Sequence, residues 1–288
     1  MSKYLYRFVM FVAITIGWPR PESHAATTGR RTANSELESR ETAGSESELR
    51  RQVVFLLHGI GKGRTDMLAM RSMLRKHGYE VVNWRYPSTK MSLDEIAELL
   101  HEEVSKYSEQ DVSFVTHSMG GIVVRTYLKN HRPQHLGRVV LIAPPNKGAY
   151  LADLLGDWLP YKLILGPAGQ QLRQGDQGGC AGAGVPCCEF GIIAGGSGRS
   201  RGMNPLIPGD NDGTVSVEST QLEGASDFLV LPYAHPVIQM MPRTGKNVIS
   251  FLLTGKFADE NKVRLPATDT TATVEMVGSV SVPDQSRR

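Results

Sequence analysis

The sequence predicts an α/β fold in which helices cover both faces of a mostly parallel central sheet. Apolar and β-branched runs typical of buried strands alternate with segments of helical periodicity over residues 52–257, and such alternation produces parallel sheets. Hydrophobic residues make up 40% of the 288 residues and charged residues 21%, as in ordinary soluble globular proteins. The composition therefore excludes a disordered, collagen-like or polytopic membrane protein.

The first elements of this domain follow one another in a regular order. Residues 53–57 (VVFLL) form a continuous apolar run that suits a strand buried on both faces. A helix is expected over residues 66–77, with Gly78 as its stop signal, and a second strand over residues 79–84. The sequence SLDE at 92–95 is a capping box, which predicts the start of an amphipathic helix.

The same alternation continues through the second part of the domain. Strands are expected at residues 112–116, 138–143, 190–194 and 228–231, and helices at residues 119–130 and 246–253. Parallel sheets of this kind collect their functional residues at the carboxyl ends of the strands. Candidate functional residues should therefore lie just after each strand.

Both ends of the chain are expected to lie outside this domain. Residues 1–25 resemble a secretory signal, because basic residues precede an apolar run of 11 residues that leads to a small-x-small cleavage site. A run of that length is too short to span a bilayer, so cleavage and a secreted or periplasmic location are favoured over a membrane anchor. Residues 26–51 and 258–288 are polar and predict a disordered linker and a disordered tail.

The charge balance limits the possible partners. The formal net charge is +3, from 32 Lys and Arg against 29 Asp and Glu, which is too balanced to indicate nucleic-acid binding. No H-E-x-x-H motif or Cys/His pair with metal-ligand spacing occurs, so neither a metal nor another cofactor is expected. We expect a monomer with an uncharged or hydrophobic small-molecule partner, and transient contact with a lipid surface stays open.

The candidate nucleophile is Ser118. It lies in the sequence THSMGG at 116–121, after a predicted strand and before a predicted helix, close to the G-x-S-x-G nucleophile elbow. Gly120 supplies the small residue that the elbow requires, whereas Thr116 replaces the usual first glycine. The alternative is a serine that only caps the helix.

The candidate base and acid come later in the chain. In folds with this elbow the order is nucleophile, acid and base. His235 is the histidine that follows Ser118 at sufficient distance, since His131 and His135 belong to the end of the helix after the nucleophile. The turn-rich segment GDNDGTV at 209–215 lies between them and offers Asp210 and Asp212. We select Asp212 as the acid.

Two backbone N–H groups are needed to stabilise a developing oxyanion. The residue after the nucleophile, Met119, supplies one of them, and Ile60 in the glycine-rich segment HGIGKG at 58–63 is the expected second donor. A phosphate-binding P-loop is the rival interpretation of this segment, but Gly63 stands where that motif needs Ser or Thr. His58 and His117 neighbour these positions and are expected to be structural hydrogen-bonding residues.

Taken together, five motifs resemble the lipase/esterase branch of the α/β-hydrolases, in particular small bacterial secreted or periplasmic lipase-like proteins. They occur in the family's order as HGIG, THSMGG, APPNKG, IPGDNDGTVSV and LPYAH, and they span the whole predicted domain. The resemblance implies an α/β-hydrolase fold, a Ser118–Asp212–His235 triad and cofactor-free ester hydrolysis. In similar lipases a D-G-x-V arrangement carries the acid, which again favours Asp212.

Residues 148–188 are expected to form an insertion between strands. The segment is very apolar for a loop, and in the resembling family this region covers the site, so we interpret it as a cap, a lid or an acyl-binding wall. Trp158 and Leu159 are the candidate substrate-binding residues, and the alternative is an additional core helix. A disulfide from Cys180 to Cys187 or to Cys188 would close the glycine-rich end of the insertion.

These observations predict a serine carboxylester hydrolase that forms an acyl-enzyme intermediate on lipid-like or uncharged esters. Two alternatives stay open: an acyltransferase or thioesterase on the same fold, and a non-catalytic module that binds a lipid or a partner. The presence of all three triad residues favours an enzyme over the binding module.

Overall fold

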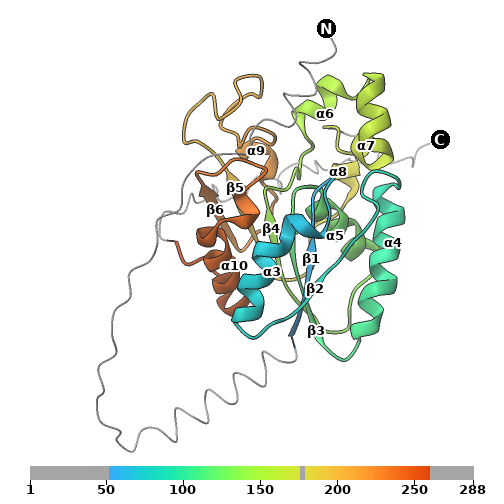
Figure 1. The fold of residues 1–288 in the computed structure, drawn as a ribbon, viewed down its shortest axis with the longest axis vertical. Coiled ribbons are helices and arrows are strands. Elements are labelled where there is room, and N and C mark those ends of the chain that lie inside the picture. The colour runs from blue at the N-terminus through green and yellow to red at the C-terminus, as the bar shows by residue number, and fades with distance from the viewer. Residues whose placement is uncertain (1–51, 176–178, 260–288) are drawn as a thin grey trace, which may run out of the picture. The chain divides into compact units, whose positions relative to one another are not determined.

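The computed structural model describes residues 52–175 and 179–259 (Figure 1). The predicted signal peptide, the linker and nearly all of the predicted tail lie outside these described residues. The sheet is six-stranded and all-parallel, with the order β2-β1-β3-β4-β5-β6. Its strands are β1 (Gln52–Leu57), β2 (Glu80–Asn83), β3 (Asp111–His117), β4 (Leu136–Ile142), β5 (Phe190–Gly195) and β6 (Asp227–Leu231).

Helices connect the strands, as the predicted alternation requires. The principal helices between strands are α3 (Leu68–Lys76), α4 (Leu93–Val104) and α5 (Met119–Asn130), and α10 (Pro242–Thr254) follows the last strand. The remaining helices are shorter or belong to the insertion: η1 (Arg64–Met67), η2 (Ser105–Tyr107), α6 (Tyr150–Leu155), α7 (Leu159–Gln171), α8 (Gly179–Gly182), α9 (Val217–Thr220) and η3 (Ile238–Met240). The predicted capping box is present, since Ser92 accepts from the Glu95 N–H and the Glu95 carboxylate accepts from the Ser92 N–H.

The sheet is covered on both faces, and alternate residues of β1 belong to two separate cores. Val53, Phe55 and Leu57 pack into the core that α4 and α5 complete, whereas Val54 and Leu56 pack into the core completed by α3 and α10. All five side chains are fully buried, and burying each one stabilises the fold by about 1.5–3 kcal/mol. The continuous apolar run is thus the consequence of a strand with two buried faces.

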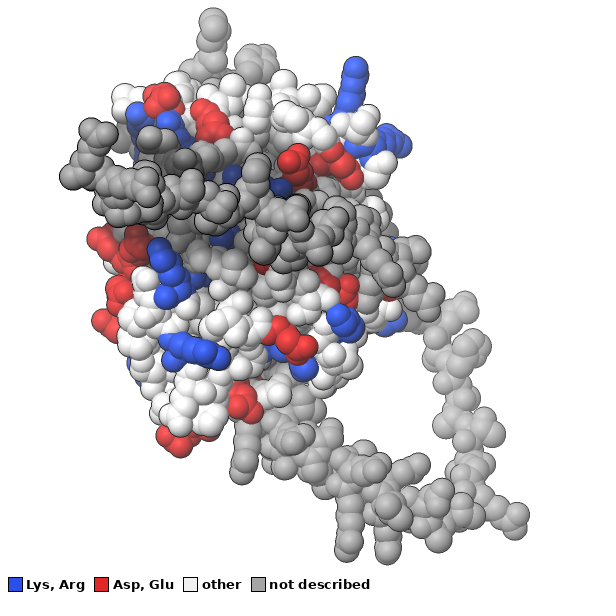
Figure 2. Space-filling model, turned by 180° about the vertical axis from the view of Figure 1, so that it is seen from behind, with Lys and Arg blue, Asp and Glu red and all other residues white. Residues whose placement is uncertain are grey.

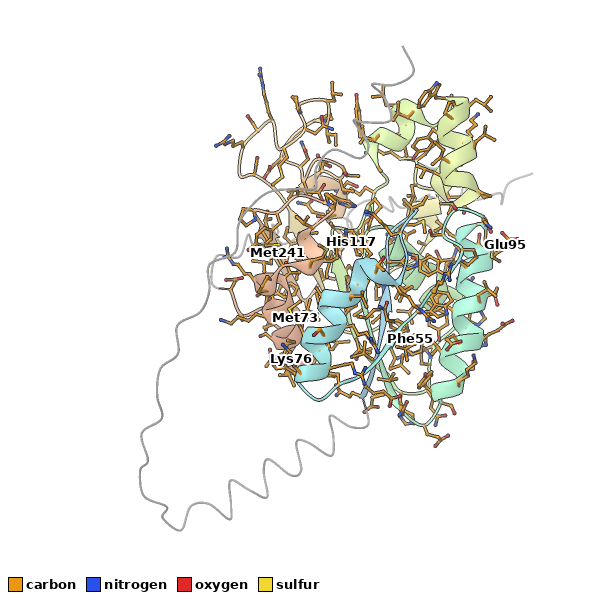
Figure 3. The ribbon with its side chains drawn as sticks, in the orientation of Figure 1. Phe55, Met73, Lys76, Glu95, His117 and Met241 are labelled. Carbon is orange, nitrogen blue, oxygen red and sulfur yellow. The ribbon has the colours of Figure 1, made fainter. Side chains whose placement is uncertain are left out.

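Helix α3 packs directly against α10 on one of these faces. Met73 lies between the two helices (Figure 3), and a Cβ atom on Gly245 would lie 2.3 Å from its sulfur. A side chain at position 245 would therefore displace the end of the flexible Met73 side chain.

Some predicted boundaries were wrong by a few residues. The α-helix expected from residue 66 begins at Leu68, because residues 64–67 form a 3₁₀ turn first. The helix expected from residue 246 begins at Pro242, a residue whose fixed φ suits the first helical turn. The domain also continues past the predicted end at 257, since the Asp259 carboxylate accepts hydrogen bonds from Arg243 and Asn247.

The insertion is helical and exposes much of its apolar surface. Helix α7 is interrupted at Gly166, where φ is 61°, just before Pro167. The expected disulfide is absent: Cys180, Cys187 and Cys188 are all free thiols. Cys180 is buried with its Sγ directed at the Gln171 carbonyl, whereas Cys187 is exposed.

A buried arginine anchors the base of this insertion. Arg125 of α5 donates from Nε to the Gly184 carbonyl (2.7 Å) and from Nη2 to the Cys180 carbonyl (3.1 Å). Its Nη1 donates to the Asn146 side chain at 3.0 Å. Burial lowers the pKa of Arg125 to about 10, and these oxygen acceptors replace the lost water.

The surface carries charges of both signs. On the face in Figure 2, Lys and Arg side chains are interspersed with Asp and Glu side chains rather than gathered in one basic area. Within the described residues, no helix is long and apolar enough to cross a membrane.

Candidate active site

Ser118 lies in a sharp turn between β3 and α5. Its backbone has φ 55° and ψ −126°, a region that residues other than glycine rarely adopt and that signals local strain. The turn brings α5 so close to β1 that a Cβ atom on Gly120 would lie 2.8 Å from the Leu57 carbonyl oxygen. Thr116, which replaces the first glycine of the motif, is buried and donates to the Val140 carbonyl at 3.4 Å.

The structure brings Ser118, Asp212 and His235 together in one hydrogen-bonded chain. His235 Nδ1 lies 2.7 Å from Asp212 Oδ2, and His235 Nε2 lies 3.0 Å from Ser118 Oγ. Because a carboxylate only accepts hydrogen bonds, His235 carries its proton on Nδ1 and its Nε2 accepts from the serine hydroxyl. All three residues are buried: Ser118 is 7% exposed, Asp212 1% and His235 8%.

The position of Asp212 is fixed from both sides of its carboxylate. Oδ1 accepts from the N–H groups of Thr214 (2.9 Å) and Val215 (2.8 Å), which leaves Oδ2 for His235. The Asp212 carbonyl also accepts from the His235 N–H at 2.9 Å. At the end of β5, a Cβ on Gly195 would lie 2.6 Å from the Asp212 Cβ, so the absence of a side chain there makes room for the acid.

The neighbouring Asp210 has a different role. Its Oδ1 accepts from the N–H and the hydroxyl of Ser197, and its Oδ2 accepts from the Gly198 N–H at 2.9 Å. These bonds hold the loop after β5. The two acids therefore have different partners.

The glycine-rich segment after β1 lies against the serine. A Cβ on Gly59 would lie 3.2 Å from the Ser118 Cβ, and Ile60 is the next residue along the chain. Met119 is the first residue of α5, and the N–H groups of a first helical turn have no acceptor within the helix. The assignment of Ile60 and Met119 as oxyanion donors stays a prediction. The Ile60 side chain contacts α7, with its Cδ1 3.3 Å from where a Gly169 Cβ would be.

The segment after β2 supports this glycine-rich loop. The Tyr86 hydroxyl donates to the His58 carbonyl, and the Tyr86 and His58 rings stack with centroids 4.2 Å apart. The Ser88 hydroxyl accepts from the Gly61 N–H at 3.1 Å. Burial lowers the pKa of His58. Two contacts therefore hold the loop on either side of Ile60.

A second histidine–carboxylate pair lies behind His235. His117 Nε2 lies 3.0 Å from the His235 carbonyl oxygen, and His117 Nδ1 lies 3.0 Å from Asp66 Oδ2. Gln239 donates to Asp66 Oδ1 at 2.9 Å. Figure 3 shows His117 at the end of β3, away from Phe55 in the middle of the sheet.

For both His117 and Asp66, burial and the hydrogen bond between them shift the pKa in opposite directions. Burial lowers the pKa of His117, and the bond to Asp66 counteracts only part of that shift. For the Asp66 carboxyl, burial alone would raise the pKa, but the hydrogen bond and charge of His117 hold it below the ordinary value. The pair joins η1 to the backbone of His235, so it holds the histidine loop in place.

The two candidate substrate-binding residues do not lie in an enclosed cavity. Trp158 and Leu159, at the start of α7, are 47% and 64% exposed. They belong to a larger apolar surface of the insertion, which we call the α6–α7 surface. It consists of Leu154, Leu155, Trp158, Leu159, Leu163 and Ile164.

Several residues that support the site were not predicted from the sequence. Tyr86 and Ser88 follow β2, so the rule that functional residues lie after strands could have identified them. Asp66 and Gln239 gave no such signal, because they meet His117 only through the fold. Over residues 52–175 and 179–259, no group of three or more His, Cys, Asp or Glu could hold a metal ion.

Comparisons with known proteins agree with this fold. A family described as the alpha/beta hydrolase fold matches residues 52–163. The mature form of the lipase BlEst2 from Bacillus licheniformis is similar in structure, with 20% identity, a TM-score of 0.54, and 73% of this chain and 93% of that chain covered. The propeptide form of the same lipase gives 22% identity, a TM-score of 0.57, and coverage of 73% and 52%. No curated protein sequence is detectably similar to this chain.

The sheet order, the nucleophile elbow and the family match define an α/β-hydrolase fold. This is the fold that the five motifs predicted. The fold and the match over residues 52–163 support a hydrolase in general terms.

Proposed function

We propose that this protein is a serine carboxylester hydrolase of the lipase/esterase type. The observation that carries the proposal is the hydrogen-bonded chain from Asp212 through His235 to Ser118, with the serine on a strained elbow. A serine hydroxyl is a weak nucleophile unless a base takes its proton, and this chain supplies an oriented base. The lipase named among the similar structures is consistent with the proposal.

The arrangement supports a two-step mechanism. Ser118 Oγ attacks the ester carbonyl while His235 Nε2 accepts the serine proton, and Asp212 stabilises the imidazolium that forms. His235 then returns the proton to the departing alcohol, which leaves an acyl-enzyme. A water molecule activated by His235 hydrolyses this intermediate and releases the carboxylic acid.

The oxyanion of each tetrahedral intermediate would be held by the N–H groups of Ile60 and Met119. Such donors act strongly because they are already in place before the charge develops, and the loss of one donor costs about 10²–10³ in kcat. Tyr86 and Ser88 contribute indirectly, since their contacts fix the loop that carries Ile60.

The proposed substrate is a lipid-like ester. Its support is the α6–α7 surface, which places six large apolar side chains in solvent on an insertion whose helix α7 contacts Ile60 of the glycine-rich loop. Exposed apolar patches of this kind mark contact sites for ligands, partners or membranes. We also propose export through cleavage after residue 25 and action as a monomer, with transient contact with a lipid surface.

The decisive experiment compares the wild-type protein with Ser118→Ala. A fluorophosphonate probe should label the wild type and not the variant, and kcat on p-nitrophenyl esters should fall by about 10⁴-fold or more because the three residues act as a unit. A series of esters from acetate to palmitate then defines the acyl preference. Equal hydrolysis by the two folded proteins would refute the proposal, and absence of labelling in both would favour a binding module.

A further inference from the structure

We propose that a hollow beside the glycine-rich loop binds an anionic group, of the phosphate monoester class, carried by the alcohol part of the ester substrate. This inference rests on the proposed function and narrows its substrate class. The hollow has a volume of about 380 Å³ and lies between Gly61 and Lys62 on one side and residues 85–90 on the other. We call it the basic hollow.

The charged residues that line the basic hollow are all positive. Lys62, Arg85 and Lys90 contribute three cations, Ser88 and Thr89 contribute hydroxyl groups, and no described lining residue is acidic. Hydroxyl groups together with ammonium and guanidinium donors form the usual environment of a bound phosphate. A cationic alcohol would be repelled by these three charges, and a neutral one would gain less than an anion from the same donors.

The three cations are available to a ligand. None of them forms an ion pair with a described carboxylate, in contrast to Arg138, which pairs with Glu189 at 2.8 Å, and Arg243, which pairs with Asp259 at 3.1 Å. All three side chains are exposed, so their donors are hydrated rather than committed to the protein. A phosphate could therefore replace water without breaking an internal contact.

The basic hollow lies close to the predicted reaction centre. Gly59 packs against Ser118, and Gly61, two residues later, lines the hollow while its N–H donates to Ser88. Two residues of extended chain span at most about 7 Å. This is the scale of a short alcohol, such as glycerol, whose esterified oxygen is at the serine and whose phosphate is in the hollow.

The same loop separates an apolar from a basic environment. Ile60 contacts α7 of the insertion, whereas Gly61 and Lys62 face the basic hollow. An ester bound across the loop would direct its acyl chain towards α7 and its anionic alcohol towards Arg85 and Lys90. The low net charge of the whole chain does not oppose this, because charges act within a Debye length of about 8–10 Å at physiological salt.

The test uses two soluble esters that differ only in the anionic group. These are 1-butyrylglycerol and 1-butyrylglycerol 3-phosphate, which are short enough to remain monomeric, so attraction to a charged lipid surface does not contribute. The quantity measured is kcat/KM for the phosphate ester divided by kcat/KM for the neutral ester. Inorganic phosphate serves as a separate competitor that probes the hollow without an ester.

The test variant is Arg85→Gln combined with Lys90→Gln, which leaves the glycine-rich loop itself intact. The matched control is Arg75→Gln combined with Lys76→Gln, because both residues are exposed cations in the last turn of α3. Figure 3 shows Lys76 at the end of α3 that is remote from His117. Both variants remove two positive charges, so only the position of the charges differs.

We expect the ratio to exceed one in the wild type and to fall about tenfold in the Arg85/Lys90 variant, because each charge-assisted hydrogen bond is worth more than a neutral one. The control should change the ratio less than about twofold, and raised salt should lower the wild-type ratio. Phosphate should inhibit the wild type more strongly than the test variant.

Two outcomes would overturn the inference, and both differ from failure of the proposed function. Equal kcat/KM for the two esters in the wild type would show that the hollow binds no substrate anion. If the ratio of the two kcat/KM values falls equally in the test and control variants, the preference for the phosphate ester arises from general electrostatic attraction and not from the basic hollow. If neither ester nor any p-nitrophenyl ester is hydrolysed, the proposed function itself fails.

Discussion

The carboxyl ends of β3, β5 and β6 and the insertion over residues 148–188 differ in how their side chains meet water. At the strand ends Asp212 is 1% exposed and Ser118 is 7% exposed, and both have hydrogen-bond partners. In the insertion Leu159 is 64% exposed and Leu163 is 76% exposed. In the first region, polar groups are buried and hydrogen-bonded within the protein. In the second, apolar side chains remain exposed to water.

This difference separates two requirements of an esterase. Proton transfer and charge stabilisation need atoms fixed within tenths of an ångström, which buried hydrogen bonds provide. Acyl binding needs only apolar area, which a helix can expose and reposition at low cost. Substitutions at the strand ends should therefore change kcat on every ester, whereas substitutions in the insertion should change the preference among esters.

The largest expected effect at the strand ends distinguishes Asp212 from Asp210. Asp212→Asn removes the charge opposite His235 Nδ1 and should lower kcat by about 10³–10⁴ on any ester, because the imidazole loses its orienting partner. Asp210→Asn should lower kcat less than about tenfold, since its carboxylate bonds the loop at Ser197 and Gly198 and the neighbouring Asn211 N–H but not His235. The measurement is kcat of both variants on one ester, and the reverse ranking would move the acid to Asp210.

A smaller loss is expected when Asp66 is changed, because it acts on His235 only through His117. Asp66→Asn keeps the shape but removes the charge that His117 Nδ1 faces at 3.0 Å. Hydrogen bonds to charged groups contribute about 1.5–3 kcal/mol, so kcat should fall about 10- to 100-fold with KM nearly unchanged.

The matched control for Asp66 is Glu189→Gln. Glu189 pairs with Arg138 at the amino end of β5, the opposite edge of the sheet. This variant also loses one charged partner, and its kcat should stay within about twofold of the wild type. A loss of thermal stability in Asp66→Asn without a loss of kcat would leave Asp66 with a purely structural role.

The sequence predicted the strand ends better than the insertion for a physical reason. Ser118, Asp212 and His235 occupy short motifs in which backbone geometry restricts the allowed residues, such as the elbow that excludes a side chain at Gly120. The alternation of apolar runs likewise predicted the strands of the sheet. Such constraints act locally, so they are visible in a few consecutive residues.

The contacts that escaped prediction depend on residues distant in sequence. Asp66 meets His117 across 51 positions and Gln239 across 173 positions. The insertion was recognised as apolar, but whether Trp158 is exposed or enclosed depends on how α7 packs, which periodicity does not determine. The predicted start of α3 was wrong for the same reason, because periodicity does not determine that a 3₁₀ turn precedes the helix.

For the insertion, the expected effect is a change of preference. Trp158→Ala should reduce kcat/KM for long-chain esters about five- to tenfold more than for acetate esters, because each CH₂ that loses contact forfeits about 0.8 kcal/mol. Leu253→Ala is the control, since Leu253 is an apolar residue 52% exposed on α10, outside the insertion. Equal losses on short and long esters would show that Trp158 is not part of an acyl site.

The smallest expected effect is a loss of folding stability at acidic pH. It should arise from buried histidines near the strand ends and not from the insertion. Burial lowers the pKa of His58 and His117 below the ordinary 6.5, so below that pH the unfolded chain binds more protons than the folded one. The stability that these neutral histidines confer is fully present above pH 6.5 and is lost as the pH falls through 6.5 towards their lowered pKa values. Asp66 and Arg85 also face His58, and their opposite charges act on it in opposite directions.

The measurement is the free energy of urea unfolding at pH 7.5, 6.5 and 5.5 for the wild type, His58→Gln and Trp158→Ala. Each buried histidine contributes a slope of at most about 1.4 kcal/mol per pH unit. His58→Gln should therefore have a shallower dependence on pH than the wild type, because glutamine does not titrate and keeps a donor for the Gly59 carbonyl. Trp158→Ala carries no titratable change and should run parallel to the wild type. If all three proteins lose stability at the same rate, the acid sensitivity does not arise from His58.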